Sequence, residues 1–333
     1  MRVWELTGDG IDALTLTDRP GIAPGPRQVR VRLDAVALNY RDLSTVRAAA
    51  ARGLALPLVP CSDGAGEVVE VGADVDELAP GDRVVSCFFQ RWTAGPCTPA
   101  AMATALGGTL DGVLADEVTL AAEGVVPAPP HLTASEAATL TCAGVTAWNA
   151  VAHTAAMKPG ETLLLLGTGG VSIFALQFAR LLGVRAIVTS KSDEKLARAR
   201  ELGAWATLNY ASRPDWDRAV LELTGGAGAD ATLEVGGAGT LARSIAATRV
   251  AGTIVLVGIL TGGAIDPVPI MRKSIRLQGL YVGPRAVHLA MNRAVTAHEL
   301  RPIIDQRFPF AEAPDAFRAL ERQEHLVKIV VEL

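Results

Sequence analysis

The stretch Leu163-Leu164-Leu165-Leu166-Gly167-Thr168-Gly169-Gly170-Val171-Ser172 is where the sequence most clearly predicts a fold. Its four leucines form a short, uniformly apolar run, which is typical of a parallel strand buried on both faces. A glycine-rich turn follows, and a helix is predicted from about Val171 to Leu182. A pyrophosphate needs backbone N–H donors, the positive end of a helix and no Cβ in its way, and this arrangement supplies all three. We therefore predict a dinucleotide site at Gly167, Thr168, Gly169, Gly170 and Val171, with an ordinary glycine turn as the alternative.

Strand and helix patterns continue to alternate after this turn. Ser172 stands where the new helix must pack closely against the first strand. A second helix is predicted from Asp193 to Leu202, between short apolar segments that predict strands. These predicted strands are residues 186–189, 206–208, 231–235 and 253–257. Buried strands separated by helices indicate an α/β fold with a doubly wound parallel sheet of the Rossmann type.

The first third of the chain has a different pattern. Residues 27–38 alternate polar and apolar side chains with a period of two, which is typical of a half-buried antiparallel strand. Residues 67–72 predict another strand, and residues 80–85 predict a turn that leads into a third. We expect a mainly β, barrel-like domain here.

The domain limits follow from changes in these patterns. After the proline-rich residues 126–130 the period becomes helical, and Thr133 or Ser135 is expected to cap a helix that continues through residues 142–153. Strands are also predicted at residues 274–282 and 327–333, and the last one is expected to return to the first domain. The predicted organisation is a first part of the β domain at 1–126, a Rossmann domain at 127–270, and a return to the β domain at 271–333.

Composition excludes several classes of function. The 333 residues carry 31 Lys and Arg against 35 Asp and Glu, a net charge of −4, which argues against a protein built to coat nucleic acid or an anionic membrane. No apolar run approaches the ~18 residues that would span a bilayer. The four cysteines are far apart in the sequence, at Cys61, Cys87, Cys97 and Cys142. We expect a cytoplasmic enzyme with a small-molecule substrate, and neither a disulfide scaffold nor a clustered zinc module.

The end of the second Rossmann strand bears on the choice of cofactor. An NAD site places a carboxylate there, which accepts hydrogen bonds from the ribose and would repel a 2′-phosphate. This chain has hydroxyl groups at this position, notably at Ser190, and ammonium groups at Lys191 and Lys195. We therefore predict NADPH (NADP) rather than NADH. The alternative interpretation of Lys195 is that it lies on the solvent-exposed face of a helix. Lys191 lies in the loop and is therefore the better candidate to bind the 2′-phosphate.

Several motifs, in this order, resemble those of the medium-chain dehydrogenase/reductase superfamily. Its branch of zinc-independent quinone oxidoreductase-like and NADP-dependent alcohol dehydrogenase-like proteins is the most similar. The resemblance covers nearly the whole chain and rests on residues 38–42, 60–68, 81–84, 142–148, 167–172 and 223–226. It implies a GroES-like catalytic domain made from both chain ends, a Rossmann domain between them and a substrate cleft at their junction. It also implies a homodimer formed through the edge strand near residues 274–282.

The metal positions are where the chain departs from zinc-dependent relatives. Where those proteins carry a Cys, His and Cys set, the matching residues here are Asn39, Ser62 and Cys142. A tetrahedral zinc site needs three protein ligands and an open position, so we expect no zinc. The structural zinc lobe is also missing, because Cys87 and Cys97 alone cannot build it. The alternative interpretation of Cys142 is that it packs in the core as a small apolar residue.

Without a metal, hydrogen-bond donors must polarise a carbonyl oxygen as hydride arrives. Asn39 can donate through its amide, and by resemblance it lies near the nicotinamide. Tyr40 could donate a proton through its phenol, and its alternative is a packed aromatic side chain. Asp42 completes the candidate catalytic set, although we expect it to hold Arg41 or a local backbone group rather than to act as a base.

The resemblance implies further cofactor contacts. Thr146 matches a hydroxyl position that faces the nicotinamide, and Val257, Gly258 and Ile259 follow the last Rossmann strand. Tyr210 resembles a family tyrosine that packs near the adenosine phosphate end of the cofactor. The alternative interpretation is an aromatic side chain on the surface.

Together these residues predict an NADPH-dependent oxidoreductase that transfers hydride to the carbonyl of a ketone, aldehyde or quinone. One alternative is an enone or enoyl-thioester reductase, and a second is a non-catalytic NADPH-binding protein.

Overall fold

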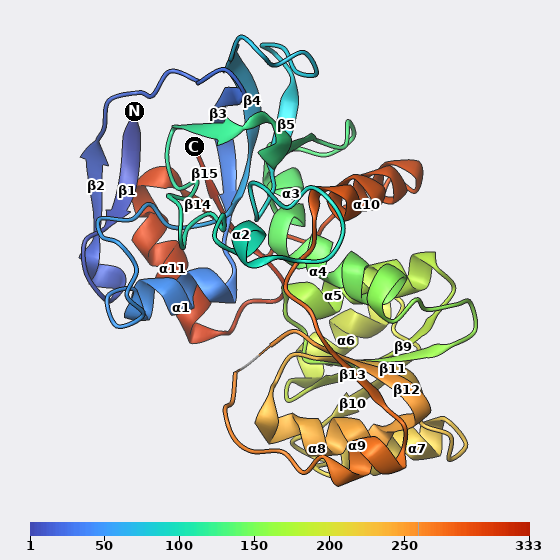
Figure 1. Ribbon diagram of the computed structural model, residues 1–333. Coiled ribbons are helices and arrows are strands. Elements are labelled where there is room, and N and C mark those ends of the chain that lie inside the picture. The colour runs from blue at the N-terminus through green and yellow to red at the C-terminus, as the bar shows by residue number, and fades with distance from the viewer. Residues whose placement is uncertain (259) are drawn as a thin grey trace. The chain divides into compact units, whose positions relative to one another are not determined.

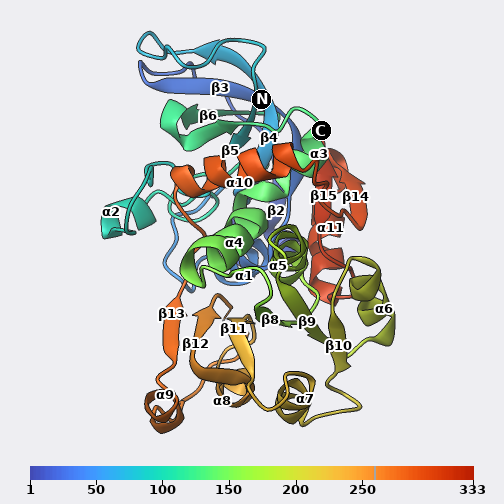
Figure 2. The same cartoon turned by 90° about the vertical axis from the view of Figure 1, so that its right-hand side faces the viewer.

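The computed structural model describes residues 1–258 and 260–333. The chain divides into two compact units, which are shown in Figures 1 and 2. Unit 1 combines Met1–Val145 with Val282–Leu333, and unit 2 is Thr146–Tyr281. Both chain ends therefore contribute to the same unit, as the sequence predicted.

Unit 2 contains a parallel sheet whose six described strands have the order β10-β9-β8-β11-β12-β13. This order is the doubly wound Rossmann arrangement, in which the chain starts in the middle of the sheet and then reverses direction. Helices α5 and α6 lie on one side of the sheet, and α7 and α8 on the other (Figure 1). The strands are β8 (Thr162–Leu166), β9 (Arg185–Ser190), β10 (Ala206–Asn209), β11 (Ala229–Glu234), β12 (Thr248–Leu256) and β13 (Arg276–Gly279). The helices are α5 (Gly170–Leu181), α6 (Asp193–Glu201), α7 (Trp216–Leu223), α8 (Ala238–Ala247) and α9 (Val268–Arg272).

Strand β8 is the centre of this sheet. All five of its residues are buried, as expected for a strand covered on both faces. On one face, Leu164 and Leu166 pack in a cluster with Trp216 of α7. The Ser172 hydroxyl donates a hydrogen bond to the Leu166 carbonyl at 2.7 Å, which ties the start of α5 to the end of β8. The close helix and strand contact predicted at Ser172 is confirmed.

One predicted strand of unit 2 is shorter than expected. Residues 274–282 were predicted to be extended, whereas β13 covers only Arg276–Gly279. Ser274 and Val282 have left-handed backbone conformations, with φ of 50° and 54°, which end the strand on both sides. Strand β12, in contrast, begins at Thr248, before the predicted residue 253.

Unit 1 is mainly β, with a hairpin of β1 and β2 beside a sheet of order β14-β15-β3-β4-β5-β7, in which β6 also pairs with β3. The strands are β1 (Arg2–Leu6), β2 (Leu14–Asp18), β3 (Gln28–Ala37), β4 (Asp63–Val71), β5 (Arg83–Ser86), β6 (Glu117–Ala121), β7 (Val125–Pro127), β14 (Gln306–Pro309) and β15 (Ile329–Glu332). The helices are α1 (Tyr40–Ala48), α2 (Pro99–Met102), α3 (Ala134–Ala138), α10 (Arg285–Ala297) and α11 (Ala313–Arg322). A single apolar core joins β3 and β15 to α1 and α11.

The last strand, β15, pairs with β3 in antiparallel register. Val330 lies opposite Ala37, and Glu332 lies opposite Ala35. The predicted return of the C-terminal strand to the first domain is confirmed. Continued by two residues, the same register sets Lys328 beside Asn39, where β3 leads into α1.

The segment between the proline-rich stretch and unit 2 is helical but not uniformly α-helical. Thr133 caps α3 in a capping box with Glu136, whereas the other predicted cap, Ser135, donates to Glu332 at 2.6 Å. The predicted continuous helix over 142–153 is instead a π-helix (Leu140–Gly144), a short α4 (Val145–Trp148) and a second π-helix (Asn149–Thr154). π-Helical turns are rare and are frequent at functional sites.

The observed unit limits differ from the predicted domain limits. Unit 1 extends to Val145 instead of residue 126, because α3 packs on β3 and β4 of the unit 1 sheet. Unit 2 extends to Tyr281 instead of residue 270, because β13 pairs with β12 at the edge of the Rossmann sheet.

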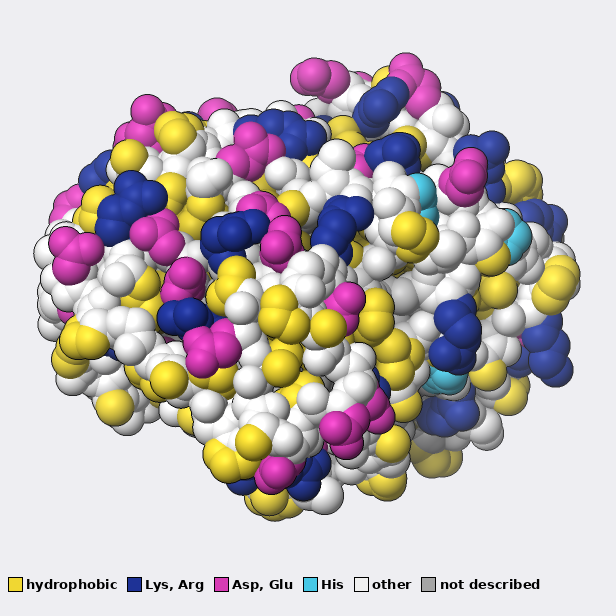
Figure 3. Space-filling model, turned by 90° about the horizontal axis from the view of Figure 1, so that it is seen from above, with side chains coloured by type: hydrophobic (Ala, Val, Ile, Leu, Met, Phe, Trp, Pro, Cys, Tyr) yellow, Lys and Arg dark blue, Asp and Glu magenta, His cyan; other side chains and the backbone are white. Residues whose placement is uncertain are grey.

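The surface carries charges of both signs. Over much of the face in Figure 3, basic side chains lie next to acidic ones. Ion pairs at the surface of the described chain include Arg47 with Glu321 and Arg307 with Glu332. Within the described residues, no helix has both the length and the apolar composition needed to cross a membrane.

His288 of α10 generates a prediction about acid stability. The ring is 2% exposed, and burial is the main cause that lowers the pKa of His288 to about 3. Below about pH 6.5 the unfolded chain binds a proton at His288, whereas the folded chain keeps this ring neutral. Acid therefore stabilises the unfolded state, and the free energy of unfolding falls as the pH drops below that value. We expect a loss of about 2 kcal/mol between pH 7 and pH 5 from this residue alone.

The measurement is urea unfolding at pH 7 and pH 5 for the wild type and for His288→Leu. Between pH 7 and pH 5, His288→Leu should lose about 2 kcal/mol less unfolding free energy than the wild type. His298→Leu, at the exposed end of the same helix, is the matched control and should follow the wild type. An equal acid sensitivity of His288→Leu and the wild type would contradict the assignment.

Candidate active site

The start of helix α1 holds all three candidate catalytic residues. Asn39 is the N-cap residue, and Tyr40 is the first residue of the helix. The buried Asp42 carboxylate accepts hydrogen bonds from the Asn39 backbone N–H at 2.8 Å and from Arg41 Nη1 at 3.0 Å. Arg41 also donates to the carbonyl oxygens of Leu106 and Gly107. The expectation that Asp42 holds Arg41 and local backbone is confirmed.

A buried ammonium group lies beside Asn39. Lys328 is 2% exposed, and its Nζ donates to Asn39 Oδ1 at 2.7 Å and to the Leu38 carbonyl at 2.8 Å. Sequence reasoning missed this residue. The available signal was a single charged residue inside the apolar run Leu326-Val327-Lys328-Ile329-Val330-Val331, since lysine is almost never fully buried unless it has a partner.

Asp63, at the start of β4, supplies the neighbouring negative charge. Its Oδ2 lies 3.7 Å from Lys328 Nζ and accepts a hydrogen bond from the Cys142 backbone N–H at 3.1 Å. Its Oδ1 accepts a hydrogen bond from the Ser62 hydroxyl at 2.7 Å. Burial raises the pKa of Asp63 to about 6, and the charge of Lys328 opposes this rise. We call Asn39, Ser62, Asp63, Cys142 and Lys328 the polar cluster.

The polar cluster does not fit a catalytic zinc ion. Of its five residues only Cys142 and Asp63 are of the kinds that usually bind zinc, one fewer than the three protein ligands of a catalytic site. The Ser62 hydroxyl already donates to Asp63, and the Lys328 ammonium repels a second cation. No group of three or more His, Cys, Asp or Glu residues in the described chain could hold a metal ion. Asn39, Ser62 and Cys142 are thus brought together, but as a hydrogen-bonded cluster.

The two donors proposed from the sequence differ in their surroundings. Tyr40 is 44% exposed, so it is not the packed aromatic of the alternative interpretation. Asn39 is 9% exposed, and its Nδ2 makes no hydrogen bond of ordinary length with the described residues, although its side chain opposes the rise in the pKa of Asp63. The amide carries two N–H donors, so at least one of them is left for another acceptor. The roles of both residues in catalysis stay predictions.

The glycine-rich turn of unit 2 has the geometry that a pyrophosphate needs. Gly167 has φ of 72°, which favours glycine, and Gly169 is the N-cap of α5. A Cβ added at Gly167 or Gly169 would meet no atom within 4 Å, so both positions face open space at the start of the helix. Thr168, Gly170 and Val171 complete this turn. The residues present therefore fit the diphosphate of a nicotinamide dinucleotide.

The end of β9 presents hydroxyl and ammonium groups. Ser190 is its last residue and Lys191 follows, exposed. Ser192 caps α6 by accepting a hydrogen bond from the Lys195 backbone N–H. The nearby Asp193 carboxylate accepts from Asn209 Nδ2 at 2.7 Å.

Tyr210 lies at the same edge of the sheet. Its backbone N–H donates to the Ser190 carbonyl at 3.1 Å, and its side chain is 40% exposed. The structure therefore brings Ser190, Lys191 and Tyr210 together at the carboxyl ends of β9 and β10. Whether the Tyr210 ring contacts a cofactor stays a prediction.

The loops after β11 and β12 are held by Glu234, a buried carboxylate that sequence reasoning also missed. Its Oε1 accepts hydrogen bonds from the Gly236 backbone N–H at 2.7 Å and from the Thr240 hydroxyl at 2.6 Å. The backbone N–H groups of Val257 and Gly258 donate to the Glu234 carbonyl. Predicted residues Val257 and Gly258 thus lie at the carboxyl end of the sheet, and Ile259 is outside the described residues. Thr146, also predicted, is a buried residue of α4.

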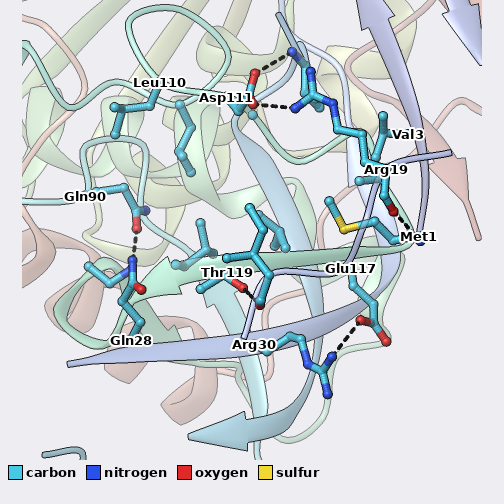
Figure 4. Close-up of a pocket in the computed structure, with 18 of the residues that line it drawn as sticks. Met1, Val3, Arg19, Gln28, Arg30, Gln90, Leu110, Asp111, Glu117 and Thr119 are labelled. Atoms are coloured by element: carbon cyan, nitrogen blue, oxygen red, sulfur yellow. Dashed lines mark hydrogen bonds and ion pairs between the residues drawn. The ribbon is translucent and has the colours of Figure 1, made fainter. Parts of the chain in front are cut away.

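A separate cavity of about 340 Å³ lies in unit 1 (Figure 4). Arg19 pairs with Asp111 at 2.7 Å, and Arg30 lies 3.6 Å from Glu117. Gln90 Oε1 accepts a hydrogen bond from the Ala121 backbone N–H. No residue of the polar cluster lines this cavity.

Two family models match the chain. Residues 25–130 match the alcohol dehydrogenase GroES-like domain, and residues 170–296 match the zinc-binding dehydrogenase model. The first match lies within unit 1, and most of the second lies within unit 2.

Curated relatives cover most of the chain. A zinc-type alcohol dehydrogenase-like protein of Schizosaccharomyces pombe is 40% identical over 316 residues, which are 92% of this chain and 91% of the relative. A quinone oxidoreductase of Pseudomonas aeruginosa is 36% identical over 218 residues, 65% of this chain and 60% of the relative.

Solved structures show the same architecture over the whole length. An NAD-dependent alcohol dehydrogenase is 33% identical with a TM-score of 0.92, and the match covers 100% of both chains. A mycobacterial protein solved in complex with NADPH is 26% identical with a TM-score of 0.84, again over 100% of both chains.

The open space at Gly169 leads to a prediction that separates binding from folding. Gly169 has φ of −75° and ψ of 176°, which valine adopts readily. We expect Gly169→Val to change the unfolding free energy by less than about 0.5 kcal/mol, as a surface substitution does. Its side chain would occupy the phosphate position, so binding of a nicotinamide dinucleotide should weaken at least about tenfold, a loss of about 1.4 kcal/mol.

Binding is measured by cofactor fluorescence titration, and stability by urea unfolding. Gly262→Val is the matched control, because a Cβ at Gly262 also meets no atom within 4 Å. Dinucleotide affinity of Gly169→Val equal to that of the control would show that the turn does not hold the phosphates.

Proposed function

The chain belongs to the medium-chain dehydrogenase/reductase superfamily, and we propose that it is a zinc-independent, NADPH-dependent oxidoreductase acting on a carbonyl group. It is an oxidoreductase of the alcohol dehydrogenase and quinone oxidoreductase type. The proposed substrate is a ketone, an aldehyde or a quinone. The observation that carries the proposal is the buried amide of Asn39, whose oxygen is held by Lys328 inside a cluster that does not fit zinc.

The residues of unit 1 supply what a carbonyl reduction requires of the protein. Bound NADPH supplies the hydride. As the carbonyl carbon accepts it, negative charge develops on the oxygen, and a preorganised donor stabilises that charge. We assign this role to the Asn39 amide. Tyr40, exposed on the same first turn of α1, is the proposed source of the proton, with water as the alternative.

Independence from zinc is proposed from the chemistry of the donor set. Cys142 is the only soft ligand of the polar cluster. Lys328 contributes a fixed positive charge where a metal ion would have to bind. These features favour hydrogen bonding over Lewis-acid chemistry at this position.

Preference for NADPH is proposed from the charges at the end of β9. Ser190 and Lys191 stand there, and the Asp193 carboxylate is engaged by Asn209. One solved relative is named NAD-dependent and another holds NADPH, so their names support a nicotinamide cofactor of either kind. A lysine beside a 2′-phosphate favours NADPH by charge complementarity.

The remaining proposals concern assembly and location. Strand β13 pairs with β12 on one side only within the described sheet, which leaves an edge for a second copy, and we propose a homodimer. The four cysteines form no disulfide, which supports the cytoplasm as the location.

A substrate panel tests the proposed reaction. The protein, washed with a chelator, is incubated with NADPH and a set of ketones, aldehydes, quinones and enones, and the absorbance of NADPH is followed. We expect carbonyl substrates to oxidise NADPH. The rate should be the same before and after the chelator wash, when the protein holds less than one zinc ion per chain. An α,β-unsaturated aldehyde separates the chemistries, because carbonyl reduction yields the unsaturated alcohol.

Each other outcome has a definite meaning. A saturated aldehyde as product would indicate an enone reductase. NADPH binding without turnover on the whole panel would indicate a non-catalytic binding protein. Loss of activity on chelation, restored by zinc, would overturn the proposal of zinc independence.

Lys191→Ala tests the cofactor preference. Removing an ammonium group from the 2′-phosphate should weaken NADPH binding about tenfold, or about 1.4 kcal/mol, and leave NADH binding unchanged. The matched control is Lys158→Ala, an exposed lysine just before the amino end of β8. Unchanged NADPH affinity in Lys191→Ala, or equal use of NADH and NADPH by the wild type, would contradict the proposal that Lys191 binds the 2′-phosphate.

A further inference from the structure

We propose that Lys328 is a positioning residue, which holds the Asn39 side chain so that its NH₂ group faces the reacting oxygen. The inference rests on the proposed function and deepens it, because it names the group that orients the proposed donor. It also explains why a lysine is buried in unit 1.

The hydrogen-bond chemistry of the two side chains allows one orientation of the amide. An ammonium group only donates hydrogen bonds, so the atom 2.7 Å from Lys328 Nζ must be the amide oxygen. A rotated amide would set two sets of N–H donors against each other and leave the ammonium with one fewer acceptor. The Nδ2 group of Asn39 is therefore directed away from Lys328.

The ammonium itself is held rigidly by backbone. The Leu38 carbonyl accepts from Lys328 Nζ at 2.8 Å, and the Leu38 N–H donates to the Ile329 carbonyl at 3.0 Å. These bonds continue the pairing of β3 with β15 past its last paired residues. Asp63, at the start of β4, lies 3.7 Å from the ammonium and balances its charge. Three strands thus fix the position of one nitrogen atom.

The amide donor that results from this arrangement is only partly used inside the protein. Nδ2 of Asn39 makes no hydrogen bond of ordinary length with the described residues, and the Asn39 side chain acts on Asp63, where it opposes the rise of that carboxyl's pKa. The NH₂ group carries two N–H donors, so Asp63 leaves at least one of them for another acceptor. An oxygen that gains negative charge during the reaction is such an acceptor.

A kinetic double-mutant cycle tests the coupling. The variants are Lys328→Met, Asn39→Ala and the combination, with Arg307→Met on the neighbouring strand β14 as the control for an exposed cation. Removing one preorganised donor lowers kcat by about 10²–10³-fold in comparable sites. We expect a loss of about 100-fold in kcat for each single variant, little change in KM, and no further loss in the double variant. Multiplicative losses in the double variant would overturn the proposal.

A second set of measurements separates positioning from folding. Asn39→Asp keeps an oxygen facing Lys328 but removes the NH₂ group, so it should keep the wild-type melting temperature and NADPH affinity while losing kcat like Asn39→Ala. Lys328→Arg, also a pure donor, should recover part of the activity lost in Lys328→Met. Wild-type kcat in Asn39→Asp, or Lys328→Arg no better than Lys328→Met, would contradict the assignment.

The crystal structure of Lys328→Met gives a readout that does not depend on turnover. We expect the Asn39 side chain to move out of its wild-type position or to occupy two positions, a change that electron density resolves, unlike a simple exchange of Oδ1 and Nδ2. An unchanged Asn39 side chain would show that Lys328 does not position it, even if no substrate had been found. A wild type that turns over no substrate would instead refute the proposed function, so the two failures are distinguishable.

Discussion

The antiparallel pairing of β15 with β3 is the constraint on which unit 1 depends. It joins residues at the end of the chain to residues near its beginning, and it places Val331 opposite Val36 in the middle of the core. The entropy lost in closing so long a loop grows only slowly with its length, so burial of β-branched side chains on both strands outweighs it. The same pairing then determines which side chain meets the start of α1.

Burying Lys328 is the energetic cost of that arrangement. Removing an ammonium and a carboxylate from water costs several kcal/mol per ion, and attraction offsets this only when the geometry is good and the remaining hydrogen bonds are made. Lys328 meets both conditions through two oxygen acceptors and Asp63. Asp63 is in turn held by the Ser62 hydroxyl and the Cys142 backbone, so the charge pair is part of a larger network. Such a network orients groups more than it stabilises the fold, which is consistent with a site that must offer a hydrogen-bond donor in one direction.

In unit 2 the main constraint is different, because a diphosphate would be bound there by backbone N–H groups. Strand β8 is apolar on both faces and ends in a turn with a left-handed glycine, so α5 starts with its N-terminus open to solvent. The Ser172 contact with Leu166 keeps the helix close to the strand. Glu234 performs a comparable task at the neighbouring strand, where its carboxylate accepts hydrogen bonds from a backbone N–H of the loop that follows β11 and from the Thr240 hydroxyl of α8. The rigid sheet thus presents several loops at its carboxyl edge, where ligands bind in open α/β sheets.

Local pattern in the sequence was enough to predict the elements whose signal is continuous along the chain. The leucines of β8, the glycine turn and the alternation over residues 27–38 each predict their structure, because burial on two faces or on one leaves a direct periodicity. The Asp42 contacts were also predictable, since a carboxylate three residues after an N-cap reaches back to its backbone N–H. The π-helical turns and the short β13 were not, because single left-handed residues and widened turns leave no periodic signal.

Lys328, Asp63 and Glu234 became functional candidates only in the folded chain. Each is a charged residue inside an apolar or small-residue segment, with no charged partner beside it in the sequence. Lys328 and Asp63 meet each other from different strands, and Glu234 is held by the loop and helix that follow β11. The sequence by itself determined two kinds of domain and a turn that fits a dinucleotide. The tertiary structure decided which charges are buried together, because strand pairing between distant segments sets those contacts and no local pattern records them.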